Sequence, residues 1–329
     1  MRHQTVAVLF LAAASLTGIG WTGESWAQAT IPRIGILLGG HTDDAVVKKW
    51  VEPFRRTLAD KGWIEGKNVV FEYRNAPADP TRFAEAAAEL VRLKVDVIWA
   101  TNAPMVRAAY ATTHTIPIVA NDFTTDPVAE GYVESYGRPG GNLTGVFLDA
   151  PEFAGKWFEL LKAMVPGLSR VVVLWDPSPG PTHLRALQAA ARSFGLQIQV
   201  VEVRTPDEID KAFSEFRGHP HALIVLPSPM FYVQSERLAK LAMMHRLPAT
   251  SMFRLFAEAG GAVAYGPELN SAYERSAILA AKILRGAKPA DLPVERPSKF
   301  ELVVNLKTVK ALGLTLADSV LYRADEVIQ

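Results

Sequence analysis

Residues 95–102 of the chain read VDVIWATN, a short apolar run followed at once by two polar residues. The run is rich in β-branched and aromatic side chains, which is typical of a buried strand. Ala103 and Pro104 come next, and proline suits the first turn of a helix. The stretch therefore predicts a strand that enters a helix through a polar turn, which is the repeating unit of a parallel α/β sheet.

The same unit recurs in two successive series, with amphipathic helical segments between the strands. The first series has strands at residues 32–38, 68–73, 95–100, 116–120 and 143–148, and the second at 170–175, 196–203, 222–226, 247–251 and 261–265. Near-continuous apolar strands separated by helices are typical of parallel sheets that are covered on both faces. We therefore predict an α/β fold with two doubly wound parallel-sheet lobes.

The C-terminal part departs from this alternation. Residues 273–284 predict a long helix, residues 286–297 are rich in proline, and residues 299–305 (KFELVVN) predict one more strand. A chain that returns after two complete lobes is expected to cross between them more than once.

The composition excludes several classes of protein. The chain has 329 residues, 35 Lys and Arg against 34 Asp and Glu, a net charge of +1, and no cysteine. This balance disfavours nucleic acid as a partner, because proteins that bind nucleic acids carry an excess of basic residues. Without cysteine there is no disulfide and no thiolate metal site.

Motifs for catalysis are missing from the sequence. No phosphate-binding GxxxxGK[ST] loop, GxSxG elbow or HExxH helix occurs. His219 and His221 flank Pro220 before a predicted strand, an arrangement more typical of a solvated loop than of a metal pair. We therefore expect no catalytic residue, no cofactor and no metal.

Candidate ligand-binding residues follow the predicted strands, because open parallel sheets bind ligands at the carboxyl ends of their strands. In the first half they are His41, Thr42, Thr101, Asn102, Asn121 and Asp126, and in the second Trp175, Ser178, Ser228, Phe231, Phe253 and Tyr265. The aromatic faces suit a flat or apolar ligand body. Helix capping is the alternative for the polar members, and core packing is the alternative for Phe231 and Phe253.

Two motifs are specific enough to indicate a family. Residues 126–131 (DPVAEG) and 138–145 (RPGGNLTG) resemble the DPV…G…RPGGNxTG signature of bacterial ABC-transporter substrate-binding proteins, the group often labelled tryptophan/tyrosine-type. Further matching stretches are GWIEG at 62–66, VPGLSR at 165–170, YGP at 265–267, ILRGAKPADLPVE at 283–295, KFELVVN at 299–305 and RADEVI at 323–328.

This resemblance implies a type I periplasmic-binding fold with a ligand clamped between two hinged lobes. The expected lobe 1 comprises residues 30–148 and 267–296, the expected lobe 2 comprises residues 149–266 and 297–329, and the hinge crossings fall near residues 148–151, 266–269 and 295–298. Gly140 and Gly141 are expected to serve a tight turn before a hinge-directed strand. Asp126 has two possible roles, holding a ligand ammonium group or capping the helix that begins near Pro127.

The implied function is binding of a small organic ligand, aromatic or amino-acid-like, by a monomer that is not an enzyme. The implied partners are the permease and ATPase subunits of an ABC importer. A periplasmic sensor that presents its closed form to a signalling receptor is the alternative, because the same sequence would serve it.

The first 29 residues have the pattern of a secretory signal. Met1-Arg2-His3 is a positive start, residues 6–21 carry no charge, and small residues stand at Ser25, Ala27 and Ala29. An uncleaved membrane anchor is the alternative. The uncharged core has 16 residues, short of the roughly 20 that span a bilayer.

We predict that export removes this segment after Ala27 or Ala29, so that the periplasmic protein begins at Gln28 or Thr30. The short apolar core is the physical reason, since it supports translocation better than stable anchoring. N-terminal sequencing of the exported protein tests the prediction. Recovery of intact Met1 in the membrane fraction would contradict it.

Overall fold

The computed structural model describes residues 31–39, 45–76, 80–148 and 152–329. The predicted signal segment, the candidate residues His41 and Thr42, and most of the first predicted hinge crossing lie outside the described residues.

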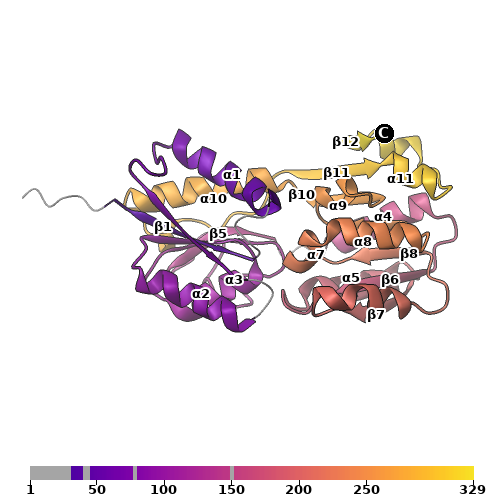
Figure 1. Cartoon of the computed structure of the whole chain (residues 1–329), viewed down its shortest axis with the longest axis horizontal. Coiled ribbons are helices and arrows are strands. Elements are labelled where there is room, and N and C mark those ends of the chain that lie inside the picture. Colours follow the sequence, from indigo (N-terminus) through magenta and orange to yellow (C-terminus); the bar gives the residue numbers. More distant parts are fainter. Residues whose placement is uncertain (1–30, 40–44, 77–79, 149–151) are drawn as a thin grey trace, which may run out of the picture. The chain divides into compact units, whose positions relative to one another are not determined.

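The first sheet has five strands in the order β2-β1-β3-β4-β5, all parallel. They are β1 (Arg33–Leu38), β2 (Val70–Asn75), β3 (Val97–Ala100), β4 (Ile118–Asp122) and β5 (Leu143–Phe147). Helices α1 (Ala45–Asp60) and α10 (Leu269–Leu284) pack together on one face, and α2 (Pro80–Arg92) and α3 (Ala103–Thr112) on the other (Figure 1). We call this sheet with its four helices lobe 1.

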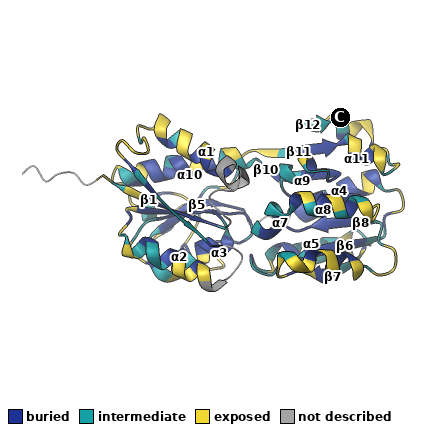
Figure 2. Cartoon of the chain, viewed as in Figure 1, coloured by how far each residue is buried: buried dark blue, intermediate teal, exposed yellow. Residues whose placement is uncertain are grey.

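Alternation along the strands fills both layers of lobe 1. Ile36 and Trp99 point toward the layer of α1 and α10, whereas Leu37 and Ile98 point toward α2 and α3. Strands β1, β3, β4 and β5 are buried along almost their whole length (Figure 2), which is why their sequences are largely apolar, whereas the edge strand β2 is mostly half-buried and carries Glu72 and Arg74.

The second sheet has seven strands in the order β12-β11-β10-β9-β8-β6-β7. They are β6 (Arg170–Trp175), β7 (Gln197–Glu202), β8 (Ala222–Val225), β9 (Ala249–Ser251), β10 (Val263–Pro267), β11 (Phe300–Asn305) and β12 (Glu326–Ile328). Its helices are α4 (Glu152–Met164), α5 (Thr182–Ser193), α6 (Ile209–Ser214), α7 (Pro229–Val233), α8 (Ser235–Met244), α9 (Arg254–Glu258), α11 (Leu306–Ala311) and α12 (Asp318–Leu321). We call this sheet with its helices lobe 2.

One pair of strands in lobe 2 departs from the parallel arrangement. Strands β10 and β11 are antiparallel, with Gly266 opposite Glu301. The reason is the path of the chain, because β10 leads out of lobe 2 into α10, which packs against β3, β4 and β5 of lobe 1. The chain then re-enters lobe 2 as β11, in the opposite direction.

The proline-rich return segment is hydrogen-bonded to the edge of the first sheet. The Phe147 N–H donates to the Glu295 carbonyl at 2.9 Å, and the Glu295 N–H donates to the Gly145 carbonyl at 2.8 Å. The Thr144 hydroxyl adds a bond to the Leu292 carbonyl at 2.8 Å. Residues 292–295 therefore lie along β5.

The RPGGNLTG signature positions β5 against β4. Gly145 has a φ of +151°, and a Cβ there would lie 2.2 Å from the Ala120 carbonyl oxygen. Gly140 has a φ of +79°, a region that favours glycine. The Asn142 side chain donates to the Thr113 and Ile116 carbonyls at 3.1 and 2.8 Å. These residues have an architectural role at the start of β5.

We predict that Gly145→Ala lowers the free energy of unfolding by about 3 kcal/mol or more, because the new methyl group collides with backbone in a strained conformation. Gly141→Ala is the matched control from the same motif, since nothing lies within 4 Å of its Cβ position. We expect the control to stay within about 0.5 kcal/mol of the parent. Urea unfolding of both variants measures the difference, and equal stabilities would refute this account of the motif.

Candidate ligand-binding site

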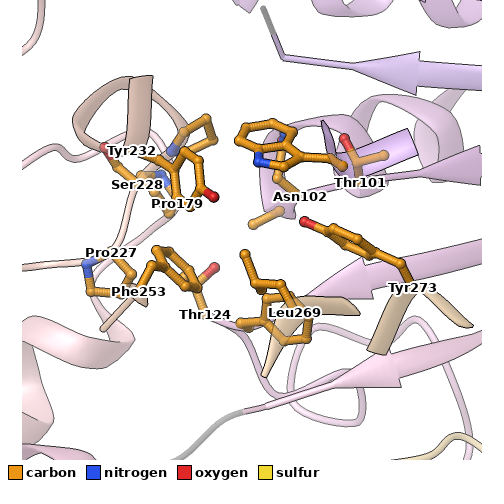
Figure 3. Close-up of a pocket in the computed structure, with 14 residues that line it drawn as sticks. Thr101, Asn102, Thr124, Pro179, Pro227, Ser228, Tyr232, Phe253, Leu269 and Tyr273 are labelled. Atoms are coloured by element: carbon orange, nitrogen blue, oxygen red, sulfur yellow. The ribbon is translucent and has the colours of Figure 1, made fainter. Parts of the chain in front are cut away.

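A cavity that is partly open to solvent lies between the two lobes (Figure 3). Lobe 1 contributes Trp50, Thr101, Asn102, Ala103, Phe123, Thr124, Leu269 and Tyr273, and lobe 2 contributes Pro179, Pro227, Ser228, Pro229, Tyr232 and Phe253. Within the described part of the chain, the lining includes no Asp, Glu, Lys, Arg or His side chain. The site is therefore an aromatic and apolar enclosure with a few neutral polar groups.

Two helix starts supply polar groups from opposite lobes. Asn102 follows β3 and caps α3, accepting a hydrogen bond on Oδ1 from the Met105 N–H at 3.2 Å. Ser228 caps α7 in the same way, accepting on Oγ from the Phe231 N–H at 3.0 Å. Proline follows within the first turn in both helices. The Thr101 hydroxyl donates to the Leu37 carbonyl at 3.1 Å.

Aromatic rings form the opposite walls. Trp50 from α1 and Tyr232 from α7 meet edge to face, with ring centroids 4.6 Å apart. Tyr232 also contacts Phe253 edge-on at 5.3 Å. Figure 3 shows the Tyr273 hydroxyl pointing into the cavity. Aromatic walls of this kind favour a flat or apolar ligand body.

The tyrosine hydroxyls stay neutral at physiological pH. Burial raises the pKa of Tyr232 to about 12, and the nearby Trp50 side chain partly opposes that rise. Burial also raises the pKa of Tyr273. Both groups are therefore available as neutral hydrogen-bond donors or acceptors.

Two buried carboxyl groups hold the loops that reach the cavity. Asp122 accepts from the Thr124 N–H and hydroxyl, both at 2.9 Å. Asp176 accepts from the Ser178 N–H and hydroxyl, also both at 2.9 Å. Burial raises the pKa of both carboxyl groups, and the local hydrogen bonds oppose that rise. Neither carboxyl group lines the cavity, so their role is to shape its loops.

Three contacts beside the cavity join the lobes. His183 Nε2 donates to the Phe123 carbonyl at 2.7 Å, and Arg107 Nη1 donates to the Ser178 carbonyl at 3.3 Å. The Trp50–Tyr232 ring contact is the third. The two lobes therefore touch each other beside the cavity.

Four of the residues predicted from the sequence lie on this cavity: Thr101, Asn102, Ser228 and Phe253. Ser178 lies next to it, bonded to Asp176 and preceding the lining residue Pro179. For Asp126 the structure shows a turn-capping contact, in which Oδ1 accepts from the Val128 N–H at 2.9 Å.

The other predicted residues lie away from the cavity. Asn121 is inside β4 and accepts from Trp99 Nε1 at 2.6 Å, and Phe231 is 3% exposed in the core of lobe 2. Tyr265 is in the middle of β10, beside Phe153. Trp175, the last residue of β6, packs against the core.

Strand boundaries explain two of these positions. The apolar runs end near residues 120 and 265, whereas β4 and β10 continue to Asp122 and Pro267. Asn121 can be buried within a strand because its Oδ1 atom accepts hydrogen bonds from Trp99 Nε1 and Ser276 Oγ. A polar residue with such partners looks like a loop residue when only the sequence is seen.

Three lining residues were missed because they come from helices and not from strand ends. Trp50 lies on α1, and Leu269 and Tyr273 lie on α10. The sequence predicts only a long helix over residues 273–284, and Tyr273 is 4% exposed in that helix. Only the packing of α1 and α10 against each other places these side chains at the cleft.

Comparison with known proteins identifies the class. A family model described as ABC transporter substrate binding protein matches residues 42–328, and the chain belongs to this family, whose members bind and do not catalyse. A relative named tyrosine-binding protein, from Clostridioides difficile (strain R20291), is 27% identical over 280 residues, which are 83% of this chain and 80% of that protein.

Solved structures show the same type I periplasmic-binding fold of two α/β lobes. A Streptococcus pneumonia ABC domain in complex with L-Trp is 24% identical, with a TM-score of 0.82 over 90% of this chain and 99% of that one. The ligand-free, open structure of a substrate-binding protein with adhesive properties from Clostridium difficile is 25% identical over the same shares, with a TM-score of 0.63.

We predict different outcomes for the two phenylalanines of this region. Phe231→Ala is expected to lower the free energy of unfolding by about 3–5 kcal/mol, because its ring is buried in the core of lobe 2. Phe253→Ala is expected to lower the free energy of unfolding by a smaller amount, because the ring of Phe253 is partly exposed and borders the cavity. Chemical unfolding of the ligand-free variants measures both. A larger loss for Phe253→Ala would mean that this ring is a core residue.

Proposed function

We propose that this protein is the periplasmic solute-binding component of an ABC importer. It clamps a small ligand with an aromatic, amino-acid-like body between its lobes and delivers it to a permease. The observation that carries the proposal is the inter-lobe cavity, which combines Tyr232, Phe253 and Tyr273 with the helix starts at Asn102 and Ser228. The ligands named for the tyrosine-binding relative and the L-Trp complex support the same chemical class.

Closure of the lobes is the proposed mechanism. A ligand that touches both lobes has its full set of contacts only in the closed form, so it favours that form. Turning a mostly open population into a mostly closed one takes about 5.5 kcal/mol of differential binding. Micromolar affinity corresponds to about −8.2 kcal/mol, which is sufficient. The higher TM-score to the L-Trp complex than to the ligand-free, open structure supports a closed state of this kind.

The proposal includes the lobe boundaries and the route of export. Residues 30–148 and 267–296 would move as one body and residues 149–266 and 297–329 as the other, hinged at the three crossings. The permease would recognise the closed pair of lobes of a monomer. The signal-like first 29 residues support periplasmic delivery. No helix among the described residues is both long and apolar enough to cross a membrane.

A thermal-shift screen followed by calorimetry tests the proposed ligand class. We expect L-tryptophan or L-tyrosine to stabilise the protein and L-leucine and D-xylose to have no comparable effect. At about 100 times its dissociation constant, a ligand adds about 2.7 kcal/mol of stability. Phe253→Ala should weaken binding, because the aromatic wall loses a face.

Met244→Ala is the control for this screen, because Met244 is 68% exposed and lies outside the cavity. Its affinity should equal that of the parent. If no aromatic amino acid binds the parent protein, or if Phe253→Ala binds as tightly as Met244→Ala, the proposed ligand class is wrong.

A further inference from the structure

We infer that Tyr273 is a specificity-determining residue, whose hydroxyl forms a hydrogen bond with an uncharged polar atom on the aromatic ring of the ligand, such as a phenol hydroxyl or an indole N–H. The inference rests on the proposed function and deepens it. It adds a requirement on the ring itself, so that an amino acid with a purely hydrocarbon ring is a poor ligand.

The first argument is the state of the Tyr273 hydroxyl. Tyr273 lies on α10 in lobe 1, is 4% exposed, and points its hydroxyl into the cavity (Figure 3). Among the described residues, no group forms a hydrogen bond with this hydroxyl. A polar group that is buried without a partner is costly and calls for an explanation in a native protein. A polar atom of the bound ligand would supply the partner once the ligand has displaced solvent from the cavity.

The second argument comes from the other hydroxyl groups of the cavity. The lining has five residues with a hydroxyl group: Thr101, Thr124, Ser228, Tyr232 and Tyr273. The two threonines donate to oxygen atoms of the protein, and Ser228 accepts from a backbone N–H. Tyr232 shares a hydrogen bond with Trp50, in which the indole can only donate. Within the described part of the chain, Tyr273 is therefore the one lining hydroxyl that no protein group engages.

The third argument is the fixed position of the Tyr273 ring. It meets Trp99 edge to face, with ring centroids 5.6 Å apart. Trp99 is itself held, because its ring stacks on Phe54 at 3.8 Å and its Nε1 atom donates to Asn121 at 2.6 Å. The phenol is therefore in place before a ligand arrives, and binding does not have to order it. A fixed group of this kind can distinguish a ring with a polar atom at that place from a ring without one.

The surroundings of Tyr273 favour an uncharged partner. Among the described residues, the lining has no charged side chain that would compensate a charge on the ligand. Burying a charge without such a partner is unfavourable. Burial likewise raises the pKa of Tyr273, so the phenol stays protonated and can donate or accept. It can accept from an indole N–H and can pair in either sense with another phenol.

Calorimetry with pairs of ligands that differ in one polar atom tests the inference. The pairs are L-tyrosine with L-phenylalanine, and L-tryptophan with L-3-benzothienylalanine, in which sulfur replaces the indole N–H. We expect the parent protein to prefer the polar member of a pair by about tenfold, which is the effect of one hydrogen bond. In Tyr273→Phe this preference should disappear. The variant should bind the polar member about tenfold more weakly and the apolar member as the parent does.

Tyr110→Phe is the matched control, because Tyr110 donates to the Gly131 carbonyl at 3.0 Å and lies outside the cavity. It should keep the parent's affinities and preference, and its unfolding midpoint should fall because a hydrogen bond within the protein is lost. Tyr273→Phe should show the opposite pattern. Its unfolding midpoint without ligand should not fall, since its hydroxyl has no partner among the described residues.

The outcomes separate this inference from the proposed function. If the parent binds neither L-tyrosine nor L-tryptophan, the proposed ligand class is wrong, and the inference fails with it. If the parent binds them but Tyr273→Phe weakens both members of a pair equally, or neither, the inference is wrong and the proposed function stands. Loss of affinity for the polar member alone supports the inference.

Discussion

The structure depends on one constraint: the chain leaves each lobe for the other at the carboxyl edge of that lobe's sheet. Strand β5 ends at Phe147 as the chain leaves lobe 1, and β10 ends at Pro267 as it leaves lobe 2. Strands β1, β3 and β4 run parallel to β5 in the first sheet, and β6, β8 and β9 run parallel to β10 in the second. The carboxyl edges of both sheets therefore face the cleft. The antiparallel entry of β11 is the consequence. Helix starts and polar turns from both lobes therefore meet at one cavity.

Two carboxyl groups at this edge fix the conformation of the loops beside the cavity without lining the cavity themselves. Asp122 and Asp176 occupy equivalent places at the ends of β4 and β6, and each binds the N–H and hydroxyl of the residue two positions later. Burial raises the pKa of both carboxyl groups, because it disfavours their charged form. The resulting loops present neutral residues to the ligand. Binding can then depend on shape, aromatic contact and directed hydrogen bonds.

Much of this arrangement follows from the sequence, and the rest does not for identifiable reasons. The strand–helix alternation predicts two lobes, and the strand ends predict Thr101, Asn102, Ser228 and Phe253 at the cleft. The sequence pattern predicts that Asn121 follows the end of a strand, whereas it lies inside β4. The apolar run stops before the strand does, because the last residues of the strand are polar although they are buried. Trp50 was missed because a tryptophan on an amphipathic helix looks like core. Its place at the cleft depends on how α1 packs, which the sequence alone does not specify.

The central claim is that the two lobes close on the ligand, and a distance measurement between them tests it most directly. The chain contains no cysteine, so spin labels attach only where cysteines are introduced. Val128→Cys and Thr205→Cys place them at exposed positions in loops that follow β4 and β7, one on each lobe. Pulsed electron spin resonance should give one short, narrow distance distribution with saturating L-tryptophan or L-tyrosine, and a longer, broader one without ligand. An unchanged distribution in a protein shown by calorimetry to be saturated would contradict closure.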